Sequence, residues 1–156
     1  MVYTLLAAPP LWQSLVKDPS RIPDTVEELL RLIPLGTNST FPRVAGDDVD
    51  GSWGRINAGS VVYLDVFAAN RDPAVFGDPL AIVPGRNGPK HLQFGYGMHH
   101  CMGAALARME IVTVLEILVA RLPGLELAVP AVEVPGVHGT ILRRPAALPV
   151  RWPSLR

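Results

Sequence analysis

The residues best suited to chemistry gather in one short stretch, residues 94–103. It contains Cys101, the only cysteine of the chain, together with two of the four histidines and three glycines. An apolar run that favours a helix follows directly. The unpaired amides at a helix start carry partial positive charge, which favours a thiolate over a thiol. Cys101 is therefore suited to act as an anionic ligand or as a nucleophile.

Three other interpretations compete at this cysteine. Lone cysteines are commonly buried structural residues, although glycines and a helix start are unusual surroundings for one. A cysteine–histidine nucleophile would need a third group to orient the base, and neither His99 nor His100 has a visible partner of that kind. A zinc site built from His99, His100 and Cys101 would lack spaced further ligands.

The spacing of the loop supplies a more specific signal. Phe94, Gly97, Cys101 and Gly103 form the pattern Phe-x-x-Gly-x-x-x-Cys-x-Gly, which resembles the haem-binding loop of the cytochrome P450 family. The next residues, Leu-Ala-Arg-x-Glu at 106–110, resemble the start of that family's helix behind the haem. The resemblance implies a non-covalent haem b with Cys101 as axial iron ligand and catalytic centre.

The same resemblance implies roles for other loop residues. Gly95, Gly97 and Gly103 would allow backbone amides to point at the sulfur and tune the iron. Phe94 would shield the sulfur from water. His99 matches a family position that contacts a haem propionate.

Charged residues upstream match a second motif. Glu28 and Arg31 have Glu-x-x-Arg spacing, and Arg86 falls where the family places the third member of a buried triad. Ile82-Val83 depart from the Phe-Asp usual before that arginine. As an alternative, Glu27 and Arg31 would form an i, i+4 pair on a solvated surface, worth about 0.2–0.5 kcal/mol.

Arg43 matches the family's arginine that contacts a haem propionate. A guanidinium suits a carboxylate by charge and by its paired donors. The acidic residues of 47–50 lack the twelve-residue spacing of a calcium loop, so we expect a solvated turn there.

Composition indicates a globular chain rather than a disordered one. The 156 residues are 49% hydrophobic and 18% charged, with 16 prolines and 14 glycines, which favours one loop-rich domain spanning 1–156. Proline placement and apolar spacing predict the elements. They are a helix from 9 to 17, a helix from 23 to 33 with a capping box of Thr25 and Glu28, a buried strand over 61–67, and a helix from Met102 to Arg121. The resemblance to the family implies one further element, a hairpin over 140–152.

Charge and hydropathy exclude several classes of protein. Fourteen basic and fourteen acidic residues leave no net field to attract nucleic acid. The start of the chain lacks the basic region of a signal peptide, and the apolar run after residue 103 contains charges that a bilayer disfavours. We therefore expect no membrane anchor. A single cysteine is compatible with a cytoplasmic location.

The resemblance implies a mainly α fold with small β-sheets (α+β), namely a truncated C-terminal part of the cytochrome P450 fold. It also implies a monooxygenase that activates O2, hydroxylates a small apolar organic substrate and receives electrons from a ferredoxin or a reductase. The family's distal helix and the segments that roof the haem have no counterpart here. The alternative is a non-catalytic haem-binding or interaction fragment.

Overall fold

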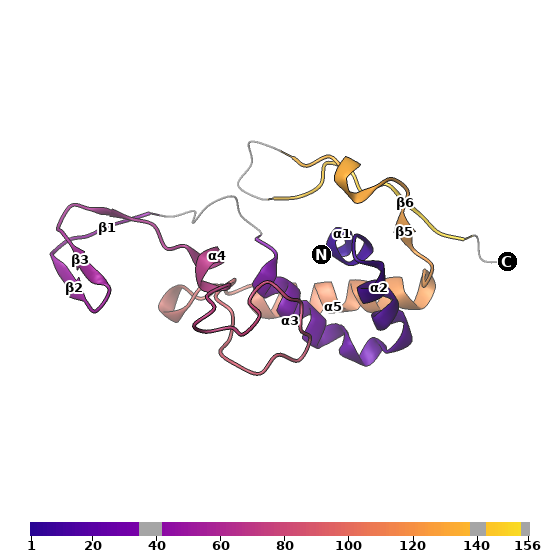
Figure 1. The fold of residues 1–156 in the computed structure, drawn as a ribbon, viewed down its shortest axis with the longest axis horizontal. Helices are drawn as coiled ribbons and strands as arrows, with labels where there is room; N and C mark the ends of the chain where they lie inside the picture. Colours follow the sequence, from indigo (N-terminus) through magenta and orange to yellow (C-terminus); the bar gives the residue numbers. More distant parts are fainter. Residues whose placement is uncertain (35–41, 138–142, 154–156) are drawn as a thin grey trace.

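The computed structural model describes residues 1–34, 42–137 and 143–153. Helices occupy the middle of the molecule, while short two-stranded sheets lie toward its two ends (Figure 1). The helices are α1 (Val2–Leu6), α2 (Pro9–Lys17), α3 (Ile22–Leu32), α4 (Val66–Ala69) and α5 (Ala104–Arg121). The predicted mainly α fold with small β-sheets is confirmed.

The strands are β1 (Arg43–Val44), β2 (Val49–Gly51), β3 (Gly54–Ile56), β4 (Val61–Val62), β5 (Glu126–Leu127) and β6 (Val150–Arg151). In the described part of the chain the strands form antiparallel pairs: β1 with β4, β2 with β3, and β5 with β6. The β5–β6 pair falls partly within the hairpin predicted over 140–152, of which residues 138–142 lie outside the described part.

The buried strand predicted over 61–67 is wrong. Only Val61 and Val62 pair in a sheet, and Tyr63 and Leu64 are 63% and 58% exposed. The strand ends early because Asp65 caps a helix: its carboxylate accepts a hydrogen bond from the Ala68 amide at 2.9 Å. The chain therefore turns into α4 where the pattern predicted continued strand.

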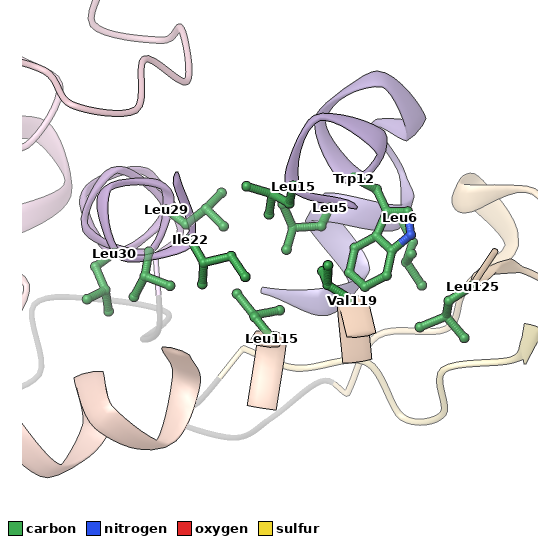
Figure 2. Close-up of a cluster of buried hydrophobic side chains, with 11 residues drawn as sticks. Leu5, Leu6, Trp12, Leu15, Ile22, Leu29, Leu30, Leu115, Val119 and Leu125 are labelled. Carbon is green, nitrogen blue, oxygen red and sulfur yellow. The ribbon is translucent and has the colours of Figure 1, made fainter. Parts of the chain in front are cut away.

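The hydrophobic core lies where α2 and α3 pack on α5 and α1 packs on α2 (Figure 2). Leu15, Ile22 and Leu29 are completely buried there, and Trp12 is 1% exposed. The indole Nε1 of Trp12 donates to the carbonyl of Pro123 at 3.0 Å, so its one polar atom is satisfied. This core fixes α3, which carries Glu27, Glu28 and Arg31, against α5, which carries Arg108.

Helix α3 begins at Ile22, upstream of the predicted start, with Pro23 in its first turn. Thr25 therefore lies inside the helix, and its hydroxyl donates to the Arg21 carbonyl at 2.8 Å. The predicted capping box of Thr25 and Glu28 is wrong, because Glu28 instead faces two arginines.

Helix α5 begins at Ala104 rather than at Met102. Leu115 and Val119 are buried against the core, whereas Leu106 and Met109 are 54% and 60% exposed. A helix with apolar residues on all sides is typically covered on more than one side. In the described ranges, no helix is both long and apolar enough to cross a bilayer.

Candidate functional site

Cys101 lies exposed at the end of the loop that leads into α5. Its backbone amide donates to the Phe94 carbonyl at 2.8 Å, which closes the loop at its base. Gly95 and Gly97 have φ angles of 73° and 71°, a region that side chains disfavour. Gly95 and Gly97 are thus required by the turn that presents the cysteine, whereas Gly103 has an ordinary negative φ.

The exposure of Cys101 overturns one of the three alternatives, and the residues around it give no support to the other two. It is not a buried structural cysteine. Within the part of the chain that the structure describes, no group of three or more His, Cys, Asp or Glu residues is placed to hold a metal ion by itself, so the zinc interpretation finds no support. His99 and His100 are exposed beside the cysteine, and among the residues that the structure describes neither side chain is hydrogen-bonded to a group that would orient it as a base.

The surroundings of the thiol fit a large apolar group that carries a metal. The large side chains beside it are nearly uncovered: Tyr96 is 87%, Met98 93% and Met102 98% exposed. Leaving so much apolar surface in water is unfavourable, and a flat apolar ligand would cover part of it. A thiolate is a soft ligand suited to iron. The residues present therefore fit a thiolate-ligated haem.

Glu28 and Arg31 form a buried pair on α3. Nε and Nη2 of Arg31 donate to the two Glu28 oxygens at 2.9 and 2.8 Å, and the side chains are 2% and 5% exposed for Arg31 and Glu28. Arg86 adds a third bond, from its Nε to Glu28 Oε1 at 2.9 Å. The three predicted members are thus in contact through their charged groups. The alternative pair of Glu27 with Arg31 is wrong.

The remaining donors of the two arginines bind backbone carbonyls. Arg31 donates to Asn70, Pro79 and Ala81, and Arg86 donates to Gly77, Asp78 and Ala81. These carbonyls belong to the irregular segment after α4, so the guanidinium groups hold that segment onto α3. A buried charge is tolerated when its hydrogen bonds are satisfied in this way.

Burial alone would raise the pKa of Glu28, but its hydrogen-bond donors outweigh that effect. Arg31 and Arg86 and the backbone amide of Val83, which donates at 3.1 Å, together hold the pKa of Glu28 below its usual value. Since Val83 contributes only its amide, the departure from Phe-Asp at residues 82 and 83 leaves this contact intact.

Asn70 joins the charged triad to the cysteine loop, a role that the sequence did not reveal. It is completely buried. Its carbonyl accepts from Arg31 at 2.7 Å, and its side-chain Oδ1 accepts from the Leu92 amide at 2.7 Å. The Leu92 carbonyl in turn accepts from the Gly95 amide at 2.9 Å. A continuous set of hydrogen bonds thus connects α3 to the first glycine of the loop.

A second charged cluster, also missed, consists of Glu27, His91 and Arg108. Glu27 accepts from Arg108 at 2.6 and 3.1 Å and lies 3.3 Å from Nε2 of His91. Burial raises the pKa of Glu27, but Arg108 and His91 more than offset it, so that pKa lies below its usual value. The pKa of His91 is also lowered, mainly by burial and partly by Arg108, against the opposing effect of Glu27.

A pocket of about 210 Å³ lies between the two clusters and does not include Cys101. It is lined by charged side chains of both clusters and by Phe76, Gly88 and Lys90.

Arg43 and His99 are not brought into contact with the cysteine by any described interaction. Arg43 lies in β1, opposite Val62, and is exposed. His99 ends a short 3-10 turn, Gly97–His99, and is exposed as well. Their proposed contacts with haem propionates stay predictions. Among the acidic residues of 47–50, Asp48 and Asp50 pair with Arg55 at the surface, in agreement with a solvated turn.

The sequence model of the family described as Cytochrome P450 matches residues 22–127. The chain is 46% identical over 151 residues to a nocardicin C N-oxygenase from Nocardia uniformis subsp. tsuyamanensis, covering 97% of this chain and 38% of that protein. It is 45% identical, with the same coverage, to a mycinamicin IV hydroxylase/epoxidase from Micromonospora griseorubida.

Solved structures of cytochrome P450 enzymes also match this chain. The LnmA cytochrome P450 hydroxylase of the leinamycin biosynthetic pathway of Streptomyces atroolivaceus S-140 superimposes with a TM-score of 0.90 at 43% identity. That match covers 97% of this chain and 39% of the hydroxylase. The chain thus spans less than two-fifths of the length of these relatives. By sequence and by fold, the chain belongs to the cytochrome P450 family.

Proposed function

We propose that the protein contributes the sulfur side of a haem-thiolate monooxygenase, with haem b bound non-covalently by Cys101. One observation carries the proposal. The only thiol of the chain is exposed at the end of a loop that turns through two glycines at positive φ, next to large uncovered apolar side chains. Bound through a thiolate, haem supplies oxygen activation, because the thiolate's electron density favours O–O cleavage.

The chain's own residues then have separate roles. Cys101 would hold the iron, with its sulfur 3.8 Å from the position that a Cβ on Gly103 would occupy. Phe94 closes the base of the loop through its carbonyl and would limit water at the sulfur. Gly95 and Gly97 would direct backbone amides toward the ligand.

Charged residues complete this assignment. Arg43 and His99 would pair with the propionates of the haem. Glu28, Arg31 and Arg86 would act structurally, by holding the segment after α4 against α3.

The proposal extends to the reactants. The substrate would be a small apolar organic molecule that is hydroxylated by O2, with electrons delivered by a ferredoxin or reductase in the cytoplasm. The relatives' names support oxidation in general: one is an N-oxygenase and another a hydroxylase/epoxidase. We further treat residues 1–156 as one partial domain, since one core joins its first helices to α5 and β5.

The test is the carbon monoxide difference spectrum of the reduced chain after reconstitution with haem. We expect a strongly red-shifted band, which is diagnostic of thiolate ligation, and its loss in Cys101→Ser. The matched control, His100→Ala, removes an exposed neighbouring side chain without an assigned role and should retain the band. No haem uptake by the parent chain, or an unchanged band in Cys101→Ser, would overturn the proposal.

Catalysis is tested separately, by product formation with a redox partner and O2. The relatives contain further sequence beyond the 38% that this chain covers. A chain that binds haem through Cys101 but forms no product would therefore be a haem-binding fragment, the alternative function.

A further inference from the structure

Glu27 is the point where three separate parts of the chain meet. It lies on α3, and its Oε1 and Oε2 accept from Nε and Nη2 of Arg108 on α5 at 2.6 and 3.1 Å. Its Oε2 also lies 3.3 Å from Nε2 of His91, in the segment that precedes the cysteine loop. The carboxylate therefore fixes α5 and the approach to the loop against the same turn of α3.

Arg108 extends this contact to the loop itself. Its guanidinium carbon lies 4.7 Å from the centre of the Phe94 ring, a distance at which cation–π attraction is effective. The rings of His91 and Phe94 are 5.9 Å apart between centroids and tilted by 50°. Phe94 is thus held by two members of the cluster, both of which contact Glu27.

His91 is itself held in one orientation. Its Nδ1 accepts a hydrogen bond from the Gln93 amide at 3.2 Å, so in the neutral ring the proton resides on Nε2, which faces Glu27. The imidazole is only 6% exposed. The 3.3 Å contact is loose for a hydrogen bond, and within the described residues Nε2 has no better acceptor.

Phe94 connects this cluster to the sulfur. Its side chain is held by Arg108 and His91, while its carbonyl accepts the amide of Cys101 at 2.8 Å. A shift of the Phe94 ring would therefore move the carbonyl that anchors the cysteine. We propose that Glu27, His91 and Arg108 are positioning residues that hold Phe94 and, through it, the backbone of Cys101. This inference rests on the proposed function, in which Cys101 is the haem ligand.

The first test uses the haem-free chain, so its outcome does not depend on haem binding. Amide hydrogen exchange is measured in Glu27→Gln, which keeps the size of the side chain but loses its charge, and in Arg108→Lys, which keeps the charge but loses the planar donors. We expect exchange at the Cys101 amide to accelerate about fivefold in each variant, because Glu27→Gln removes the ion pair and Arg108→Lys weakens both the paired hydrogen bonds and the cation–π contact. Core amides of α3 and α5 should exchange at parent rates.

Arg151→Met is the matched control. Arg151 also bridges two elements through an ion pair, with its Nε 2.7 Å from Glu126 Oε1, but at the β5–β6 sheet. It should leave exchange in residues 94–103 unchanged. Unchanged exchange at Cys101 in Glu27→Gln, or equal acceleration throughout α3 and α5, would overturn the inference, because the cluster would then have no specific effect on the loop.

A double-mutant cycle tests the path through Phe94. If Arg108 acts on Cys101 through the Phe94 ring, the effects of Arg108→Lys and Phe94→Leu on Cys101 exchange should be less than additive. Full additivity would reject that path.

The second test uses the haem-reconstituted chain. Glu27→Gln and Arg108→Lys should shift part of the carbon monoxide band from the thiolate position to that of a neutral thiol, whereas Arg151→Met should not. If the parent takes up no haem, the proposed function fails while the exchange result still decides the positioning role. If the parent binds haem and the variants keep the full thiolate band, the positioning role at the sulfur fails.

Discussion

Arg86 and Glu28 are 58 residues apart in the sequence, yet Nε of Arg86 donates to Oε1 of Glu28 at 2.9 Å. The same oxygen accepts from Arg31 and from the Val83 amide, so it has three donors. This carboxylate is therefore where the segment before the cysteine loop is anchored to α3. Because the guanidinium groups of Arg31 and Arg86 share this one carboxylate, removal of the Glu28 side chain should strongly destabilise the fold.

Glu28→Ala should destabilise the haem-free chain by about 3–5 kcal/mol, because it leaves two arginines, one of them fully buried, without their counter-charge. Urea unfolding followed by tryptophan fluorescence gives the measurement. Arg151→Met, which removes an exposed ion pair, is the control and should cost at most about 1 kcal/mol. A Glu28→Ala chain as stable as that control would contradict the structural role of the triad.

Asn70→Leu should destabilise the chain by about 1–3 kcal/mol, because the Leu92 amide would lose its acceptor in a partly buried position. The loss should be accompanied by faster hydrogen exchange at Leu92 and Gly95. Asn57→Leu removes an amide side chain that makes only an exposed contact to Arg55, so it provides the control. Parent-like exchange at Leu92 in Asn70→Leu would show that the bond has no role in ordering the loop.

The sequence was most informative where a motif has fixed spacing. Glu28 and Arg31 match the family's Glu-x-x-Arg spacing at the expected distance upstream of the cysteine loop, and the pattern around Cys101 locates that loop. Helix boundaries were less certain, because they depend on local competition. Asp65 ended a predicted strand by capping α4, and Pro23 moved the start of α3 upstream of Thr25.

The contacts of Glu27 could not be deduced from its neighbours. Local spacing favoured a pair with Arg31 four residues on, but Arg31 turns to Glu28 and to carbonyls in the segment after α4. Glu27 instead forms an ion pair with Arg108, 81 residues away in the sequence. This contact forms only when α3 packs on α5. In the sequence, the Leu-Ala-Arg pattern that contains Arg108 is the one feature that points to a role for this arginine. Tertiary contacts of this kind leave no periodic trace in a single sequence.

Acidification should destabilise the chain in two steps. The pKa of His91 is lowered from 6.5, so the unfolded chain binds a proton before the folded chain does, and stability is lost as the pH falls below about 6.5. The pKa values of Glu27 and Glu28 are lowered from 4.5, so their contributions are complete above that value and are lost as the pH falls through the folded-state pKa values. Urea unfolding at pH 7.5, 6 and 5 should therefore show decreasing stability.

His91→Gln separates the first step from the second. Glutamine keeps an amide donor toward Glu27 but does not titrate, so the variant should lose less stability between pH 7.5 and 5 than the parent. At lower pH, where Glu28 becomes protonated, both chains should lose stability together. Identical pH profiles for parent and variant across the upper range would exclude His91 as the source.

Gly97→Ala should destabilise the loop by about 1–2 kcal/mol through its backbone alone. A Cβ at Gly97 would have no atom within 4 Å, so crowding is excluded, whereas its φ of 71° is a conformation that alanine disfavours. Gly46→Ala is a close control, because a Cβ there also has open space and that glycine is not among those with positive φ. Hydrogen exchange at the Cys101 amide should accelerate in Gly97→Ala and stay at the parent rate in Gly46→Ala. Equal rates in the two variants would mean that the loop accommodates a changed backbone at residue 97, and the glycine would then be needed for close approach of a ligand rather than for the turn.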